Sequence, residues 1–232
     1  MKAPQVSVII PVCNEEGNVA QLQTELELAL REVSHELLFV DDGSQDKTLE
    51  QIERTPAVRI LEFVKNTGQS AAIYAGLAAA SGKILVLIDG DLQNDPSDIP
   101  RLLAEIDQGA DLVCGYRLKR RDTWFKRVQS KIANRVRSRF TKDGVRDTGC
   151  TLKAMRSECR EALIPFHGMH RFIPALIKGL GYKVTEIPVN HRARQHGSSK
   201  YNFGNRALQA TIDMFGVRWL LARQIKFAIK PK

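Results

Sequence analysis

The sequence of 232 residues lacks the features that mark several classes of protein. No apolar stretch approaches the roughly 18–20 residues that a membrane-spanning helix needs. The four cysteines lie far apart without a Cys-x-x-Cys pair, which argues against zinc and a disulfide scaffold and fits a reducing compartment. The opening MKAPQVSVIIPV has too short an apolar run for a signal peptide and predicts a first strand. We therefore expect a cytoplasmic protein, soluble or peripheral to a membrane, with no transmembrane helix.

Two glycine-rich phosphate-binding signatures are also missing. The sequence contains neither G-x-G-x-x-G nor G-x-x-x-x-G-K-[ST], so a bound diphosphate would have no glycine cradle at a helix N-terminus. This absence argues against dehydrogenases and P-loop NTPases. The charge of a diphosphate would have to be met by a metal ion and by basic side chains.

Positive charge is concentrated in one segment. The net charge is +9, and residues 117–146 hold twelve lysines and arginines against two acids, which gives +10 for that segment alone. Such a patch indicates an anionic partner: phospholipid, a phosphate-bearing substrate or nucleic acid. Apolar residues recur there at every fourth position, between basic ones, at Trp124, Val128, Ile132, Val136 and Phe140. The pattern predicts an amphipathic helix over 122–140, suited to an anionic membrane surface or to packing on the core with a solvated basic face.

The first half of the chain alternates short apolar runs with longer amphipathic ones. This alternation predicts an α/β fold with a mostly parallel sheet and helices on both faces. The expected strands are Val6–Pro11, Glu36–Val40, Arg59–Val64, Ile84–Asp89 and Asp111–Gly115. The expected helices between them cover residues 17–32, 46–54, 69–80 and 98–108.

The last third of the chain has a mixed pattern. It predicts a helix over Arg171–Leu180, a strand over Lys183–Asn190 and a polar loop over His191–Lys200. A final helix is expected from Tyr201 to Ile229, followed by a basic tail. One face of that helix carries the apolar residues Leu208, Ile212, Phe215 and Trp219.

Polar clusters follow four successive predicted strands. They are Asn14-Glu15, Asp41-Asp42-Gly43-Ser44, Asn66-Thr67-Gly68-Gln69-Ser70 and Asp89-Gly90-Asp91-Leu92-Gln93. In open parallel sheets, ligands bind beyond the carboxyl ends of the strands. Four such clusters at one edge therefore predict a binding site.

The pair Asp89 and Asp91 suits a hard divalent cation. Mg²⁺ prefers one or two carboxylates together with substrate phosphates, and Gln93 can add a carbonyl oxygen or bind a metal-bound water. Taken alone, Asp89-Gly90-Asp91 could instead be an acidic turn that binds no ligand. The clusters at the other strand ends favour the metal site.

Asp41 and Asp42 suit hydrogen bonding to the hydroxyls of a ribose or to a base N–H. The alternative is local: Ser44 or Asp46 caps the next helix, with Gly43 in the turn. Both hold together if Asp46 is the cap, which would leave Asp41 and Asp42 free for a ligand.

Taken in order, these segments resemble a known family. Pro11-Val12-Cys13-Asn14-Glu15, VDDGSQDKT, NTGQSAA and IDGDLQNDP are similar to the family-two glycosyltransferases, most of all to the polyprenyl-phosphate sugar transferases typified by dolichyl-phosphate mannosyltransferase. The resemblance runs over residues 6–117 and resumes at 194–200, where RQHGSSK resembles the R-x-x-G-x-S-K loop of that group. It implies a Rossmann-like fold of the GT-A type. It also implies a catalytic domain over 1–200, with a donor half at 1–115 and an acceptor half at 116–200, and an amphipathic helix and tail over 201–232.

The resemblance also implies roles for particular residues. The nucleotide sugar would be bound by Pro11, Asn14, Glu15, Asp41, Asp42, Asp89, Ser199 and Lys200. Mg²⁺ or Mn²⁺ would be held by Asp89, Asp91 and Gln93. The catalytic residues would be Asp91, Arg117 and Arg194, with Arg117 facing the phosphate of the acceptor and Arg194 closing over the phosphates.

The function implied is inverting transfer of a sugar from GDP-mannose or a UDP-sugar to a polyprenyl phosphate. A lipid phosphate is already ionised near neutral pH and needs no base, only cations that place it. Transfer to a glycan or small-molecule hydroxyl is the alternative; it needs a base, for which Asp147 is the one unassigned acid we nominate. A nucleic-acid-binding module explains the basic segment but not the acidic strand ends, so we expect no nucleic-acid partner. Many members of the family carry membrane-spanning helices, which this chain lacks, so a separate membrane-anchor protein is a possible partner.

Overall fold

The computed structural model describes residues 4–117, 137–193 and 203–225. Its centre is a seven-stranded sheet in the order β3-β2-β1-β4-β6-β5-β7. The strands are β1 (Val6–Val12), β2 (His35–Asp41), β3 (Val58–Glu62), β4 (Ile84–Leu87), β5 (Leu112–Arg117), β6 (Lys153–Arg156) and β7 (Val184–Val189). All six predicted strands are therefore confirmed, with ends that differ by a few residues.

The sheet is parallel except for one strand. β1 pairs in parallel with β2 and β4, β2 with β3, and β5 with β7. β6 is antiparallel to both of its neighbours, β4 and β5. Sequence analysis missed β6 because its four residues, KAMR, show no apolar alternation.

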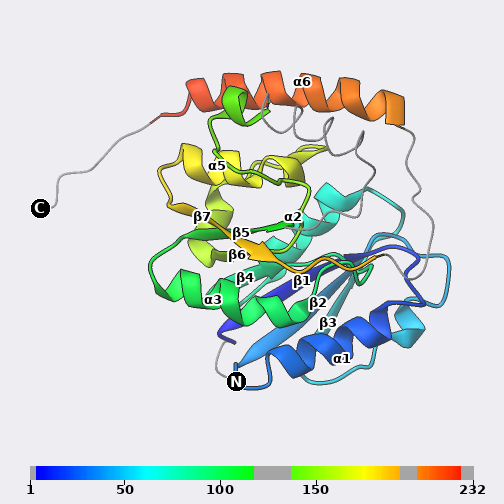
Figure 1. Ribbon diagram of the computed structural model, residues 1–232. Coiled ribbons are helices and arrows are strands. Elements are labelled where there is room, and N and C mark those ends of the chain that lie inside the picture. The colour runs from blue at the N-terminus through cyan, green and yellow to red at the C-terminus, as the bar shows by residue number, and fades with distance from the viewer. Residues whose placement is uncertain (1–3, 118–136, 194–202, 226–232) are drawn as a thin grey trace, which may run out of the picture.

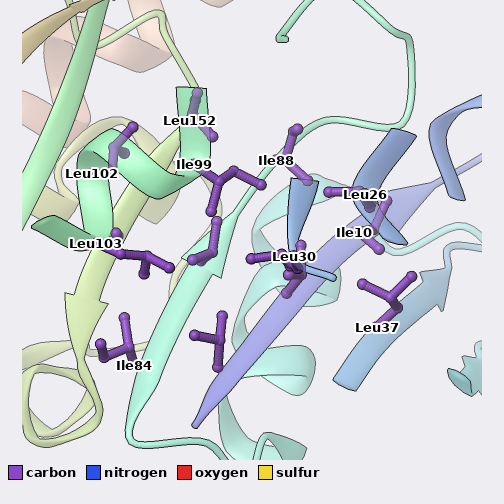
Figure 2. Close-up of a cluster of buried hydrophobic side chains, with 14 of the residues drawn as sticks. Ile10, Leu26, Leu30, Leu37, Ile84, Ile88, Ile99, Leu102, Leu103 and Leu152 are labelled. Atoms are coloured by element: carbon purple, nitrogen blue, oxygen red, sulfur yellow. The ribbon is translucent and has the colours of Figure 1, made fainter. Parts of the chain in front are cut away.

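Helices cover both faces of the sheet, as predicted (Figure 1). They are α1 (Val19–Ala29), α2 (Gln69–Ala79), α3 (Ile99–Asp107) and α5 (Ile173–Gly179). Successive residues of β1 point to opposite faces, so Val8 and Ile10 join one buried cluster and Ile9 joins the other. Figure 2 shows the first cluster, in which Leu26 of α1 and Leu102 of α3 lie against the sheet.

The prediction of a helix over residues 46–54 is wrong. The structure has only the short 3₁₀ helix η1 (Leu49–Gln51) in this segment. Asp46 accepts hydrogen bonds from Thr48 N at 2.9 Å and Thr48 Oγ1 at 2.5 Å, and Thr48 Oγ1 in turn accepts from Glu15 N at 2.8 Å. These side-chain bonds fix the backbone in a turn and tie it to the neighbouring loop, which competes with a longer helix.

Three further 3₁₀ helices, η2 (Pro96–Asp98), η3 (Ser157–Ala162) and η4 (Met169–Arg171), connect the larger elements. The last helix of the described chain, α6 (Phe203–Ala222), packs against α5. Of the amphipathic helix predicted over 122–140, residues 137–141 are helical and 118–136 lie outside the described residues. No helix in the described ranges is long and apolar enough to cross a membrane.

Candidate active site

Several loops meet at one edge of the sheet. β1, β2 and β4 are parallel, so their carboxyl ends lie together. Because β6 is antiparallel to β4 and β5, the segment that precedes β6 reaches the same edge as the ends of those two strands. The topology therefore adds residues 147–152 to the polar clusters that the sequence predicted.

The loops after β1 and β2 hold each other in place. Asn14 has a φ of 57°; its N–H donates to Ser44 Oγ at 2.9 Å, and its Oδ1 accepts from Gln45 N at 2.7 Å. Glu15 Oε2 accepts from Asn18 Nδ2 at 2.5 Å within the first loop. These two loops, which the resemblance assigns to the nucleotide, therefore form one unit.

Asp41 and Asp42 are both buried, and both bind the protein itself. Ser44 N donates to Asp41 Oδ2 at 3.1 Å, and Ser44 Oγ donates to Asp41 Oδ1. Asp42 accepts from Thr67 N at 2.6 Å and from Gly68 N at 2.8 Å. Each carboxylate therefore closes a turn, and its binding of a ligand stays a prediction. A carboxylate has about four lone-pair sites, so acceptor capacity remains for a ligand.

The acidic pair after β4 is held from two sides. Gln69 Nε2 donates to Asp89 Oδ1 at 2.8 Å, and Thr151 Oγ1 donates to Asp89 Oδ2 at 2.5 Å. Burial, and then the charge of the buried Asp91, raise the pKa of Asp89 to about 6, against the opposing effects of Thr151, Lys153 and Gln69. Two neighbouring carboxylates repel each other, and a hard divalent cation would relieve that repulsion.

Between the two acids, Gly90 brings the turn close to the end of β1. A Cβ built on Gly90 would lie 2.8 Å from Val12 Cγ1 and 3.3 Å from Pro11 O. Any larger residue would therefore push this turn away from the strand. The close approach sets Asp89 and Asp91 beside Pro11, one of the residues assigned to the nucleotide.

Gln93 joins this turn to the segment that follows β7. Gln93 N donates to Asp91 Oδ1 at 3.2 Å, while Gln93 O accepts from Arg192 N at 2.8 Å and lies 3.0 Å from His191 Nδ1. The predicted polar loop after β7 therefore starts beside the acidic pair. Its assigned residues lie outside the described part of the chain: Arg194, Ser199 and Lys200.

Arg117, at the end of β5, forms a two-point salt bridge with Asp147. Arg117 Nε donates to Asp147 Oδ2 at 2.7 Å, and Arg117 Nη2 donates to Oδ1 at 2.9 Å. Asp147 also accepts from Gly149 N at 3.2 Å. Burial and then the charge of Arg117 lower the pKa of His191, against smaller opposing effects of Asp91 and Asp147.

Two contacts link the loop of Asp147 to the acidic turn: Thr151 Oγ1 donates to Asp89 Oδ2, and Asn94 Nδ2 donates to Cys150 Sγ at 3.6 Å. They place the salt bridge and the acidic pair around one site.

Three residues of the site were missed by sequence analysis. Gln69 lies in the quoted NTGQSAA segment, so its motif was a signal, although no role was assigned to it. Thr151 and Lys153 carry no such signal, because only the antiparallel strand β6 brings them to this edge. Lys153 is buried, and its Nζ donates to Cys150 O.

Similar solved structures share the fold. Glucosyl-3-phosphoglycerate synthase from Mycobacterium tuberculosis, in complex with Mn²⁺, uridine diphosphate and phosphoglyceric acid, matches with a TM-score of 0.71 and 20% identity, over 96% of this chain and 80% of that chain. The same enzyme with Mn²⁺, UDP-glucose and glycerol 3-phosphate matches with a TM-score of 0.68 and 20% identity, over 93% and 80%. Its complex with Mg²⁺ and uridine diphosphate matches with a TM-score of 0.68 and 20% identity, over 93% of this chain and 79% of that chain.

The family follows from the sequence match. The family described as glycosyl transferase family 2 matches residues 7–163, which is more than half of the chain and includes the described residues of the site up to Thr151 and Lys153. The GT-A-like fold with its mostly parallel sheet agrees with this match. The chain belongs to glycosyl transferase family 2 and is a nucleotide-sugar glycosyltransferase.

Proposed function

We propose that this chain transfers a sugar, with inversion, from GDP-mannose or a UDP-sugar to polyprenyl phosphate at the cytoplasmic face of a membrane. The observation that carries the proposal is the Arg117–Asp147 salt bridge, whose loop also bonds the acidic pair through Thr151. The bridge fixes the Arg117 guanidinium as a cation for an acceptor phosphate. It also occupies the Asp147 carboxylate, which a hydroxyl acceptor would need as a base. Residues 1–115 would bind the donor and residues 116–200 the acceptor.

The acidic turn fits Mg²⁺ or Mn²⁺. Asp89 and Asp91 would supply carboxylate oxygens, and Gln93 an amide oxygen or a bond to a bound water. Within the described residues there is no group of three or more His, Cys, Asp or Glu that could hold a metal, so donor phosphates would complete the ligand set. Mn²⁺ or Mg²⁺ accompanies uridine diphosphate in the mycobacterial structures, which supports this assignment. When bound, the ion would neutralise charge on the departing diphosphate.

The acceptor side of the site suits a phosphate. Asp147 accepts two hydrogen bonds from the Arg117 side chain and one from Gly149 N, so it serves better to hold Arg117 than to remove a proton. A phosphate monoester has a second pKa of about 6, so near neutral pH it attacks without a base. Phosphoglyceric acid and glycerol 3-phosphate in the mycobacterial structures also carry phosphate, which supports a phosphate-bearing acceptor.

The remaining roles follow the same scheme. The loops after β1 and β2 would bind the nucleoside through Pro11, Asn14, Glu15, Asp41 and Asp42. The loop after β7 would close over the phosphates through Arg194, Ser199 and Lys200. The membrane is the source of the acceptor, so the chain would work as a peripheral protein, alone or beside a separate membrane-anchor protein, and without nucleic acid. Its four cysteines are free thiols, which suits the reducing cytoplasm.

A second candidate is transfer to a hydroxyl of a glycan or small molecule. The mycobacterial enzyme is named a glucosyl-3-phosphoglycerate synthase and has been crystallised with glucosyl-3-phosphoglycerate, which favours this class of acceptor. Asp147 would then have to leave Arg117 and act as the base. The two candidates differ in the bond that is formed, which product analysis can identify.

The test is product analysis with a panel of donors and acceptors. Purified full-length protein would be incubated with GDP-mannose or UDP-glucose, with Mn²⁺ or a chelator, and with polyprenyl phosphate, 3-phosphoglycerate or free sugars. We expect a sugar–phosphate–lipid product of inverted anomeric configuration that forms only with the metal. A product that retains the donor's configuration, or transfer to free sugars or 3-phosphoglycerate alone, would refute the proposal.

A further inference from the structure

Helix α6 carries exposed apolar side chains on the side that faces away from α5. Ile212, Phe215 and Trp219 are 61%, 57% and 64% exposed. Their spacing of three and four residues places them on one side of the helix. Figure 1 shows α6 at the edge of the molecule beyond α5, with the short helical segment 137–141 beside it. We call these three residues the outer stripe.

The opposite side of α6 fixes this orientation. Val217 is buried, and Met214 and Leu221 pack against the buried cluster around α5. On the same inward side, Asp213 Oδ2 lies 4.0 Å from Arg171 Nη1. Turning the helix to bury the outer stripe would expose these inward residues, so the stripe is not a misplaced part of the core.

Basic residues border the outer stripe. Arg218 and the exposed Arg223 lie on the same helical segment and just beyond it, and the printed sequence continues with three lysines after Ile225. Phe215 also contacts Phe140 edge-on, with ring centroids 4.9 Å apart, at the end of the basic segment 117–146. The stripe therefore combines tryptophan and phenylalanine with positive charge, as surfaces that bind anionic lipid do.

We propose that the outer stripe of α6 docks this chain on an anionic lipid surface, with Trp219 and Phe215 entering the interface. This inference rests on the proposed function, because it names the surface that would hold the active site near a lipid acceptor. A second copy of the chain fits less well. Three side chains expose far less area than the roughly 800 Å² per partner that stable interfaces bury. Pairing α6 with itself would also bring the two sets of arginines together.

Vesicle sedimentation of the full chain tests the proposal. Vesicles would contain phosphatidylglycerol and phosphatidylcholine, or phosphatidylcholine alone, with no sugar donor or acceptor. The double variant Ile212→Ser/Trp219→Ser leaves the Phe140–Phe215 contact in place. We expect it to lose about tenfold or more of the partitioning to anionic vesicles, because it removes two large apolar side chains from the interface. The matched control Leu28→Ser/Val64→Ser removes two exposed apolar side chains elsewhere and should bind like the parent.

Tryptophan fluorescence locates the contact independently. The sequence holds two tryptophans, so Trp124→Phe leaves Trp219 as the only reporter. We expect its emission to shift to the blue with anionic vesicles. No shift, or unchanged sedimentation of the double variant, would overturn the proposal. The proposal would also be overturned if gel filtration showed the parent to be a dimer and the double variant to be a monomer that still binds vesicles.

The same assays separate this inference from the proposed function. Transfer to a short-chain, water-soluble polyprenyl phosphate should be equal in the parent and in the double variant. If vesicle binding occurs through the outer stripe but no polyprenyl phosphate is glycosylated, the proposed function fails and the docking surface stands. If the soluble acceptor is glycosylated but the double variant binds vesicles normally, the docking surface fails and the proposed function stands.

Discussion

The Arg117 guanidinium and the Asp147 carboxylate form a two-point salt bridge with side chains only 14% and 9% exposed. The pair joins the end of β5 to the loop before β6, thirty residues apart in sequence. Gly149 lies directly against it, because a Cβ there would be 2.8 Å from Arg117 Nη2. Such a pair fixes the direction of the arginine, so that a bound phosphate meets a placed cation rather than a mobile one.

The first prediction concerns Asp147→Asn. This change removes the charge that holds Arg117, and we expect kcat/KM for the acceptor to fall by about ten- to a hundredfold, mainly through KM. The KM for the donor should change little, and the pH–rate profile should keep its shape. Steady-state kinetics with each substrate varied in turn measures this.

Arg117→Lys is the companion variant to Asp147→Asn. Lysine keeps the positive charge but cannot make the two-point bond, so we expect a similar rise in acceptor KM. Loss of one limb of the pH–rate profile in Asp147→Asn, with acceptor KM unchanged, would instead identify Asp147 as a base.

The second prediction concerns the acidic pair. Asp91→Asn should abolish the rise in melting temperature that Mn²⁺ and a nucleoside diphosphate together produce, because a ligand stabilises only the state that binds it. Thermal unfolding with and without a chelator measures the effect. Asp95→Asn is the matched control; its carboxylate binds Ser97 N and Arg192 instead, and the metal-dependent shift should survive. Equal shifts in both variants would contradict the metal assignment.

The third prediction concerns Gly43, in the turn after β2. Its φ is +72°, and an added Cβ would lie 2.7 Å from Asn66 N. Gly43→Ala should lower the free energy of unfolding by about 1–3 kcal/mol, as measured by urea denaturation. Gly68→Ala, with a φ of +100° but nothing within 4 Å, tests backbone strain alone and should cost less. An equal loss in the two variants would show that the close approach to Asn66 is unimportant.

The fourth prediction concerns Glu36, near the start of β2. Burial alone would raise the pKa of Glu36, but hydrogen bonds from Ser7, Ser81 and Arg59 outweigh it and lower the pKa to about 2. A carboxylate with a lowered folded-state pKa stabilises the fold above its ordinary pKa of 4.5, and that stability is lost as the pH falls from about 4.5 towards 2.

Glu36→Gln should therefore reduce the free energy of unfolding at neutral pH by about 2 kcal/mol and flatten its decline in acid. Denaturant titrations at a series of pH values measure both effects. Glu32→Gln, at an exposed position, is the control and should leave the curve unchanged. A Glu36→Gln curve parallel to that of the parent would rule out this account.

Local sequence patterns were enough to predict six of the seven strands, the helices α1, α2, α3 and α5 that cover them, and the edge where the polar clusters meet. Strands such as β1 alternate between the two buried faces, and helix α3 carries periodic apolar residues, so each was visible locally. Because parallel strands end at one edge, the clusters around Asn14, Asp42 and Asp91 were expected to meet, and they lie on adjoining loops of that edge.

The contacts of those residues depend on how distant segments of the chain pair. The antiparallel strand β6 has no apolar period, yet it brings Thr151 to Asp89 and Asp147 to Arg117 across separations of 62 and 30 residues. The outward direction of Trp219 was equally hidden, because α6 is apolar on two sides and only packing selects the side to bury. Local periodicity specifies which faces are apolar, whereas pairings between distant segments depend on the whole chain being folded.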